Sequence, residues 1–329
     1  MASTKVTIPT IDFCDSELKP NTPQWESTKV QVFEALQEFG CFEAIYNKVP
    51  NEIREGMFDT LKEVFDFPLP KLIEYREKPF HIYDGQIPSV PLFGSVYSAD
   101  LVLPNSVETF ANTFWSHGNP NFSNVAKSYF KQLMELNDMV KKMVLESLGL
   151  KNYIDEFLNS NVYMSRFTNY KVIKGENENK SGLPSHTDSS YLTIIKQNQN
   201  GLQVLYKNGE WIELNRQNGL QVLYKNGEWI ELNHTSPNSY IVLSEDVFMA
   251  WTNDRLTSAQ HRVVTTGDKE RFSIQVFSFP NPDYTVKVPQ ELVDEEHPLM
   301  YKPFKMSEYN KYIMLGAKNG LGVKNYCGL

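Results

Sequence analysis

The spacing of hydrophobic positions changes about halfway along the chain. In the first half, apolar residues recur every three or four positions, which is typical of helices with one buried face. Three such stripes are present: Trp25, Val32, Leu36 and Phe39, followed by Gly40; Ile53, Met57, Leu61 and Val64, followed by FPLP; and Val125, Tyr129, Leu133, Leu136, Val140 and Met143. The pattern predicts helices whose apolar faces pack into a common core.

After Asn161 the chain changes to short runs rich in β-branched and aromatic residues, separated by turn residues. These runs are YMSRFTNY, YLTIIK, LQVLY, WIEL, SYIVLS, VFMAW, AQHRVVTT and RFSIQVFSF. Several short strands at close spacing are typical of a β-sandwich or barrel. With a further helix expected at residues 306–315, the sequence predicts an α+β protein. We expect a double-stranded β-helix (jelly roll) core, a helical N-terminal region and a C-terminal helix.

Residues 199–216 and 217–234 form a tandem duplication within the strand-rich part. Both copies read QNGLQVLYKNGEWIELN, and they differ only in the last residue, Arg216 or His234. Each copy predicts a hairpin, because Asn-Gly between two apolar runs is a strong turn signal. Two units are too few for a solenoid, so we interpret one copy as additional. The sequence leaves open which copy enters the sheet, or whether each contributes one strand; about eighteen residues are expected to leave the barrel as a projecting hairpin or loop.

Composition and charge argue against some classes of binding partner. The chain has 329 residues, of which 41% are hydrophobic, and a net charge of −8 without any basic run. Nucleic acid and anionic membranes are therefore not expected as partners. The N-terminus lacks the apolar run of a signal peptide, and the three cysteines have no paired or metal-type spacing. These features predict a monomeric cytoplasmic protein with free thiols.

Two histidines and one carboxylate supply candidate chemistry. His186 and Asp188 lie two positions apart in SHTD, so on a strand they would face the same side. Taken alone, this pair is better interpreted as a polar pair at a strand end in contact with solvent. His261, in another predicted strand, completes the ligand set that non-haem iron(II) oxygenases use, which leaves coordination positions open. Together the three residues predict an iron site.

Ten residues after His261 comes the pair Arg271 and Ser273. On a strand both side chains would point inward, and a buried guanidinium is costly unless an anion matches it. Its planar fork suits a carboxylate. The alternative is a structural arginine paired with a surface acid.

These motifs resemble those of the plant 2-oxoglutarate- and iron(II)-dependent dioxygenases. SHTD, NDRLTSAQHRVV and RFSIQVF occur in that order, and TIPTIDF, CFEA and FPLP have counterparts in the same family. The resemblance implies that His186, Asp188 and His261 bind Fe(II). It also implies that Arg271 and Ser273 bind the distal carboxylate of 2-oxoglutarate, with help from Tyr170. Dioxygen is then the second cosubstrate, and ascorbate is a candidate reductant.

The resemblance also implies a division of the chain and a type of reaction. Residues 1–158 would form the N-terminal helical dioxygenase domain, residues 159–282 the iron and 2-oxoglutarate jelly-roll domain, and residues 283–329 a capping segment. The implied reaction is hydroxylation, desaturation or ring closure at an unactivated C–H bond of a small plant specialised metabolite. The chain looks nearest to the alkenyl-producing dioxygenases of glucosinolate metabolism and to relatives acting on lignans or steroidal alkaloids.

The chain departs from the family pattern at three places. It has TNYKVIKG where Asn-Tyr-Tyr-Pro-Pro-Cys is common, Glu245-Asp246 where Gly-Asp is common, and Asn253-Asp254-Arg255 where Asn-Gly-Arg is usual. Asp254 can adopt the left-handed conformation that such a turn requires. Removing one repeat copy would shorten the Asp188 to His261 separation from 73 to 55 positions, which is typical of the family.

Strand parity indicates which residues line a substrate pocket. Arg166 and Thr168 share a face with Tyr170, and Gln275, Phe277 and Phe279 share one with Ser273; Phe114 and Trp115 are further candidates. Two other functions stay open: an oxidase of the same fold that does not use 2-oxoglutarate, and a catalytically silent jelly-roll protein that binds a small ligand.

Overall fold

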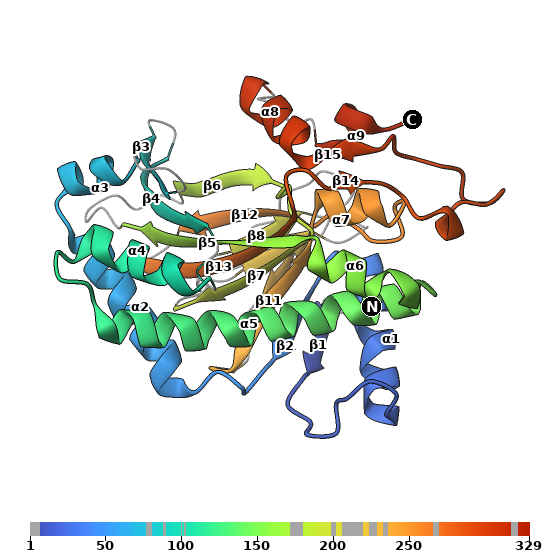
Figure 1. Ribbon diagram of the computed structural model, residues 1–329, viewed down its shortest axis with the longest axis horizontal. Helices are drawn as coiled ribbons and strands as arrows, with labels where there is room; N and C mark the ends of the chain where they lie inside the picture. The colour runs from blue at the N-terminus through green and yellow to red at the C-terminus, as the bar shows by residue number, and fades with distance from the viewer. Residues whose placement is uncertain are drawn as a thin grey trace, which may run out of the picture.

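The computed structural model describes residues 7–76, 81–87, 90–99, 101, 103–171, 180–198, 202–205, 220–223, 229–232, 236–265, 270–316 and 322–329. Within these residues, two sheets occupy the centre of the molecule, and helices lie against them (Figure 1). The large sheet has the strand order β1 (Thr10–Asp12), β2 (Cys41–Ile45), β11 (Ser239–Ser244), β7 (Leu192–Gln197), β13 (Arg271–Pro280), β5 (Asn161–Tyr170), β4 (Val90–Ala99) and β3 (His81–Ile87). The small sheet has the order β10 (Trp229–Leu232), β9 (Leu220–Leu223), β8 (Leu202–Leu205), β12 (Gln260–Thr265) and β6 (Lys180–His186). A short pair, β14 (Thr285–Val286) and β15 (Phe304–Lys305), lies in the C-terminal segment.

The helices surround the sheets on two sides. They are α1 (Pro23–Glu38), α2 (Asn51–Asp66), α3 (Leu69–Arg76), α4 (Pro104–Phe114), α5 (Pro120–Ser147), α6 (Ile154–Asn159), α7 (Asp246–Trp251), α8 (Met306–Gly316) and α9 (Val323–Cys327), with 3-10 turns η1 (Lys151–Tyr153) and η2 (Gln290–Leu292). Figure 1 shows α5 running along one side of the sheets, with α8 and α9 on the opposite side. All six residues of the predicted α5 stripe are buried. None of the described helices is both long and apolar enough to cross a bilayer.

Alternation along the strands gives the large sheet two apolar faces. Phe167 of β5 belongs to the main core, which includes the buried face of α5. Tyr170 of β5 belongs to a second, smaller cluster together with Val263 of β12, and Leu183 of β6 packs against it. The second cluster therefore joins the two sheets. Because residues two apart share a face, Arg166 lies on the same face as Tyr170, toward the space between the sheets.

A glycine sets the junction between α1 and β2. Gly40 has φ +70°, and an added Cβ would lie 2.8 Å from the carbonyl oxygen of Thr257. Its own carbonyl accepts a hydrogen bond from the backbone N–H of Ser244 at 2.8 Å. Only glycine combines this backbone conformation with such a close approach, and the contact ties β2 to the segments that lead into and out of α7.

The run VFMAW was predicted as a strand, and this is wrong. It forms α7, in which the backbone N–H of Met249 donates to the carbonyl of Glu245 at 3.0 Å. The rings of Phe248 and Trp251 pack on Phe157 of α6, at centroid distances of 5.5 Å and 4.6 Å. A short apolar run fits a buried strand or a buried helix equally well, so periodicity could not separate the two.

Both copies of the duplication contribute strands to the small sheet. β8 comes from the first copy and pairs antiparallel with β12, with Val204 opposite His261. β9 comes from the second copy and lies parallel to β8, and β10 follows antiparallel to β9. The sequence leaves open whether one copy enters the sheet or each copy contributes one strand; among the described residues the first copy contributes one strand and the second contributes two. Residues 199–201 and 206–219, which include the rest of the first copy, lie outside the described residues.

The hairpin of β3 and β4 was not predicted from the sequence. It extends the large sheet beyond β5, with Phe93 opposite Tyr170 and Tyr97 opposite Arg166. Strands from the first 158 residues thus complete the sheet that carries β5 and β13. The division into three segments stays a prediction.

The turn after α7 has the backbone conformation expected of it. Asn253 has φ +54° and Asp254 has φ +61°, which confirms that aspartate tolerates the left-handed region here. The carboxylate of Asp254 accepts from the hydroxyl of Tyr301 and from Nζ of Lys324, the latter at 2.7 Å. Asp254 therefore anchors the C-terminal segment, which a glycine could not do.

Candidate metal centre and cosubstrate site

His186, Asp188 and His261 converge on one point between the sheets. His186 ends β6, and His261 is its direct cross-strand partner in β12. Nε2 of His186 lies 3.6 Å from Oδ1 of Asp188, and Nε2 of His261 lies 3.7 Å from Oδ2. One ligand atom from each residue lies within 4.8 Å of the other two. Two imidazoles and one carboxylate at this spacing fit a divalent iron ion bound on one face.

Backbone carbonyls fix the orientation of both imidazole rings. Nδ1 of His186 lies 2.8 Å from the carbonyl oxygen of Pro184, and Nδ1 of His261 lies 2.9 Å from that of Ala259. A carbonyl can only accept, so Nδ1 carries the proton in each ring and Nε2 presents its lone pair to the centre. Burial, and then the neighbouring His261, lower the pKa of His186 to about 4. His186 is therefore neutral near pH 7, as metal binding requires.

Hydrogen bonds, not strand parity, orient Asp188. Strand β6 ends at His186, so Asp188 lies in the following loop. The hydroxyl of Thr193 donates to Oδ2 of Asp188 at 3.2 Å. The backbone N–H of Asp188 donates to Oε2 of Glu245 at 2.9 Å, and its carbonyl accepts from the backbone N–H of Asp246 at 3.1 Å. Three elements therefore hold the carboxylate at the centre: the β6 loop, β7 and the start of α7.

Glu245 is a carboxyl group fully shielded from solvent beside the metal centre. Burial, and then the negative charge of Asp188, raise its pKa well above the ordinary value. Its Oε1 has no hydrogen-bond partner among the described residues. Glu245 thus acts on Asp188 through the single backbone contact made by Oε2.

Arg271 lies at the other end of the space, at the start of β13. It is 4% exposed, and its guanidinium carbon lies 4.9 Å from the ring centroid of Tyr170, its cross-strand partner. Nη2 donates to Oε1 of Gln197, while Nε and Nη1 are buried without a partner among the described residues. Burial lowers the pKa of Arg271, and Tyr170 partly offsets this effect. Unpaired guanidinium nitrogens in a buried site fit the carboxylate of a dicarboxylic acid.

Ser273 lies next to Arg271 on the same face of β13 and is fully buried. Its Oγ accepts from Nε2 of Gln275 at 2.7 Å, so its own hydroxyl hydrogen is free to donate. Oε1 of Gln275 accepts from the hydroxyl of Thr168 at 3.2 Å. The floor of the site is therefore a connected row of polar groups on β5 and β13.

Of the residues predicted to line the pocket, those on β5 and β13 differ in their neighbours. Arg166 is half-buried opposite Gln275, and Thr168 is buried opposite Ser273. Phe277 lies opposite Thr193, the residue that bonds to Asp188, and its ring is 6.0 Å from that of Phe279. Phe279 is half-buried and packs against the main core.

The structure does not bring Phe114 and Trp115 to the site. Phe114 is fully buried, and both rings pack in an aromatic cluster with Phe110. Phe110 in turn contacts Phe167, with ring centroids 5.5 Å apart. Since Phe167 projects from β5 on the side opposite to Arg166, Phe114 and Trp115 belong to the main core.

Sequence reasoning missed several groups near the centre. Phe93 and Tyr97 reach it through the pairing of β4 with β5, and Thr193 and Glu245 do so through contacts with Asp188. The one available signal was the replacement of the family's glycine by Glu245. This replacement marked position 245 as different from the family, but it did not indicate the hydrogen bond between Glu245 and the backbone of Asp188.

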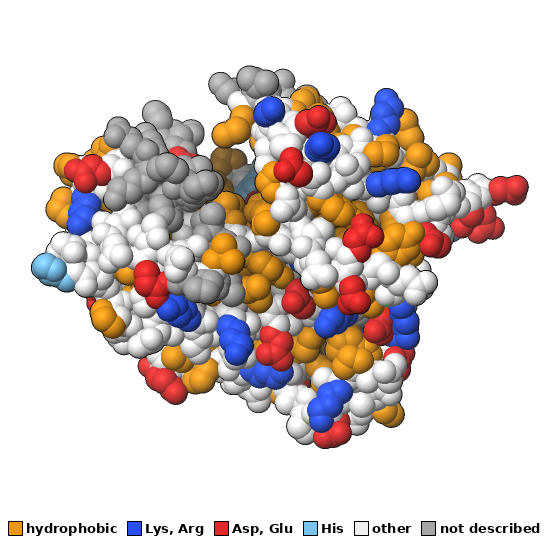
Figure 2. Space-filling view, in the orientation of Figure 1, with side chains coloured by type: hydrophobic (Ala, Val, Ile, Leu, Met, Phe, Trp, Pro, Cys, Tyr) orange, Lys and Arg blue, Asp and Glu red, His pale blue; other side chains and the backbone are white. Residues whose placement is uncertain are grey.

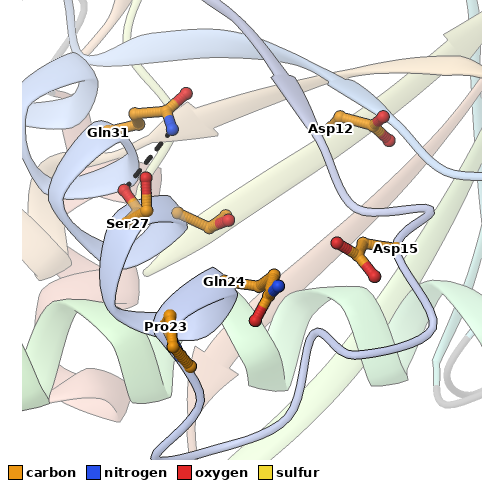
Figure 3. A pocket seen from close by; sticks show the side chains of 7 residues that line it. Asp12, Asp15, Pro23, Gln24, Ser27 and Gln31 are labelled. Atoms are coloured by element: carbon orange, nitrogen blue, oxygen red, sulfur yellow. Dashed lines mark hydrogen bonds between the residues drawn. The ribbon is translucent and has the colours of Figure 1, made fainter.

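The molecular surface is hollowed beside α8, and a histidine side chain is visible in the hollow (Figure 2). A separate pocket of 390 Å³ lies at the start of α1 (Figure 3), lined by Asp12, Asp15, Pro23, Gln24, Ser27, Thr28 and Gln31. Asp12 and Asp15 there accept from backbone N–H groups two residues on, as turn residues do. None of the candidate site residues lines this pocket.

Comparison with known families agrees with this geometry. The 2OG-Fe(II) oxygenase superfamily matches residues 163–218 and 213–280, two segments that meet inside the duplication. The family described as "non-haem dioxygenase in morphine synthesis N-terminal" matches residues 8–88. The chain belongs to the 2OG-Fe(II) oxygenase superfamily. It is a dioxygenase that depends on iron(II) and 2-oxoglutarate.

Individual relatives place it with the plant members. It is 36% identical to the probable 2-oxoglutarate-dependent dioxygenase AOP1.2 of Arabidopsis thaliana, over 94% of this chain and 92% of the relative. It is 27% identical to a probable inactive dioxygenase AOP2 of the same plant, over 92% of each. Among solved structures, the dioxygenase for auxin oxidation from rice has a TM-score of 0.79 at 25% identity, covering 98% of this chain and 100% of that one. The chain therefore resembles the AOP dioxygenases and has a jelly-roll core.

Proposed function

We propose that His186, Asp188 and His261 bind the iron, and that Arg271, Ser273 and Tyr170 bind the distal carboxylate of 2-oxoglutarate. The second substrate would be a small plant specialised metabolite with an unactivated C–H bond, bound near Arg166, Thr168 and Phe277. The observation that carries the proposal is the convergence of three ligand atoms within 4.8 Å of one another. When bound, iron with 2-oxoglutarate and dioxygen supplies the oxidant, and succinate and carbon dioxide are the coproducts.

The protein's own residues orient the metal ligands, bind the carboxylate of 2-oxoglutarate and exclude water from the site. The proton on Nδ1 of each histidine is held by a carbonyl, so both rings are preset for metal binding at Nε2. Arg271 offers two unpaired nitrogens to one carboxylate, and Ser273 offers a hydroxyl hydrogen beside it. Apolar side chains between the sheets, including Val263 and Ile195, exclude water from the site.

The experiment that tests this function is a coupled assay. The iron-loaded protein is incubated with 2-oxoglutarate, dioxygen and a plant metabolite extract, and succinate is measured. Metabolites are scored for the gain of one oxygen or the loss of two hydrogens. We expect iron-dependent formation of succinate together with one of these mass changes. Gain of one oxygen would indicate hydroxylation, and loss of two hydrogens would indicate desaturation or ring closure.

Two outcomes would contradict the proposal. Oxidised product without succinate would indicate an oxidase of the same fold that does not use 2-oxoglutarate. A metabolite that binds but yields neither product nor succinate would indicate a catalytically silent binding protein. Binding without turnover has to be measured because the chain is similar both to an AOP2 relative named as inactive and to an AOP1.2 relative named as a dioxygenase.

A further inference from the structure

Arg166 is held by two aromatic rings and forms no ion pair within the part of the chain that the structure describes. Its guanidinium carbon lies 5.1 Å from the ring centroid of Phe93 and 4.9 Å from that of Tyr97, both on β4. Tyr97 is its direct cross-strand partner. Two aromatic contacts fix the position of the guanidinium group. They do not neutralise its charge.

The polar groups around Arg166 are already committed. Nε of Arg166 is shielded from water and has no hydrogen-bond partner among the described residues. No described carboxylate lies within ion-pair distance, 4.0 Å, of its guanidinium nitrogens. Gln275, opposite Arg166 on β13, uses its amide on Thr168 and Ser273. A shielded guanidinium nitrogen without a partner is costly, so the site favours a ligand that supplies an acceptor.

Arg166 lies within electrostatic range of the metal centre. Burial opposes the charge of Arg166 itself, while Tyr97, Tyr170 and then the carboxylates of Asp188 and Asp84 raise its pKa. The guanidinium is therefore charged, and it faces the same space as the iron ligands.

Two described carboxylates, those of Asp84 and Asp188, act on Arg166 electrostatically. Neither of them forms an ion pair with its guanidinium group, and Asp188 is a proposed ligand of the iron.

We propose that the second substrate carries an anionic oxygen group, a carboxylate or a sulfate, and that Arg166 binds it. This inference rests on the proposed function and narrows its substrate class. The rings of Phe93 and Tyr97 hold the guanidinium so that its free edge meets the anion. The anion would thereby place the rest of the substrate toward Phe277 and the metal centre.

The first test uses the iron-loaded protein and a plant metabolite extract divided by anion exchange into acidic and neutral fractions. Succinate coupled to a mass change should come from the acidic fraction. Esterification of that fraction with a methylating reagent should abolish the reaction if the group is a carboxylate and leave it unchanged if it is a sulfate. Coupled product from the neutral fraction alone would overturn the inference while supporting the proposed function. Succinate from neither fraction would contradict the proposed function itself.

The second test compares Arg166→Met with Arg166→Lys, which keeps the charge. With the active acidic fraction, Arg166→Met should raise the KM for the substrate at least about tenfold, as expected for a lost charge-assisted hydrogen bond. Arg166→Lys should raise the KM for the substrate less than Arg166→Met does. Direct binding is read without turnover, by calorimetry under nitrogen with phenylacetate and phenylacetamide as probes. Phenylacetate should bind the wild type more tightly than phenylacetamide does, and Arg166→Met should remove the difference.

Two results would overturn the assignment of Arg166. One is an unchanged preference for phenylacetate in Arg166→Met. The other is a rise in the KM for 2-oxoglutarate as large as that for the substrate, which would place Arg166 in the cosubstrate site. In both cases the assignment of iron and of Arg271 would still stand, because neither depends on Arg166.

Discussion

The buried carboxyl of Glu245 accepts a hydrogen bond from the backbone N–H of Asp188 at 2.9 Å. No other described group bonds to that N–H, and Asp188 lies in a loop beyond the end of β6. Glu245 stands where the resembled family commonly has glycine, so this support for the metal-binding loop belongs to this chain's own sequence.

We expect Glu245→Ala to lower the affinity for iron(II) about 10- to 100-fold, as loss of outer-shell support commonly does. Glu245→Gln keeps an oxygen at the same position and should retain most of the affinity. Titration of the apoprotein with iron(II) under nitrogen measures both variants. Equal affinity in Glu245→Ala and the wild type would show that Thr193 and Asp246 suffice to hold Asp188.

Each iron ligand should be indispensable. His186→Ala, Asp188→Ala and His261→Ala should each abolish succinate formation, because each removes one of three protein ligands. The folded state should persist, as judged by circular dichroism. His297→Ala is the matched control, since His297 is an exposed histidine that bonds to Asp294 instead. Full activity in any of the three ligand variants would refute the metal assignment.

Arg271→Ala should raise the KM for 2-oxoglutarate more than the KM for the second substrate. The lost contact with a carboxylate is worth about 1.5–3 kcal/mol. Arg271→Lys keeps the charge but not the planar fork. Its KM for 2-oxoglutarate should therefore lie between those of the wild type and Arg271→Ala. An unchanged requirement for 2-oxoglutarate in Arg271→Ala would make Arg271 a structural residue.

The sequence predicted those parts of the site that depend on short-range pattern. SHTD and RFSIQVF identify residues by type and spacing, and strand parity correctly placed Arg166, Thr168 and Tyr170 on one face. Phe114 and Trp115 were added as candidates without a strand to fix the direction of their side chains, and they lie in the main core instead. Phe114 is the last residue of α4 and Trp115 comes directly after it. The ring of Phe114 at this helix end packs with Phe110, which contacts Phe167.

The remainder of the site depends on long-range pairing that local pattern does not encode. Phe93 and Tyr97 lie on a strand whose alternation is broken by Pro91 and Gly94, and only its pairing with β5 brings them to Arg166. Likewise, VFMAW forms a helix in which Phe248 and Trp251 both pack on one ring of α6, that of Phe157. Tertiary contacts decided both cases.

Lys141 of α5 should make stability depend on pH. Its side chain is fully buried, with Nζ bonded to Asn161 at 3.0 Å, and burial lowers its pKa from 10.5 to about 7. Below pH 7 both folded and unfolded chains hold the proton, and the cost of burying the charge is fully present. Between pH 7 and 10.5 only the unfolded chain holds it, so stability rises with pH, by at most about 1.4 kcal/mol per pH unit.

The free energy of unfolding of Lys141→Met should therefore rise less steeply between pH 7 and 9 than that of the wild type, as measured by denaturant unfolding. Lys131→Met, at an exposed lysine of the same helix, should follow the wild-type curve. Parallel curves for Lys141→Met and the wild type would mean that Lys141 keeps its charge in the folded protein.

Deletion of residues 199–216 should give a protein at least as stable and as active as the full chain. In the full chain β8 is the strand hydrogen-bonded to β12, with Val204 opposite His261, and β9 lies outside it. After the deletion, β9 has the same sequence as β8 and follows the same residues, so it can take the place of β8 beside β12. The hairpin to β10 is unchanged, and the shorter connection recovers about 2 kcal/mol or less of closure entropy.

The duplication supplies its own matched control. Deleting residues 217–234 instead gives a chain of the same length that differs from the first deletion only in having Arg216 in place of His234 before Thr235. The two deletions should therefore have equal melting temperatures and equal rates of succinate formation. A clear loss in both would show that the parallel pair of β8 and β9 is part of the working sheet, because removal of either copy leaves one LQVL strand where the full chain has two. A loss in only one would trace to the residue before Thr235 and not to the number of strands.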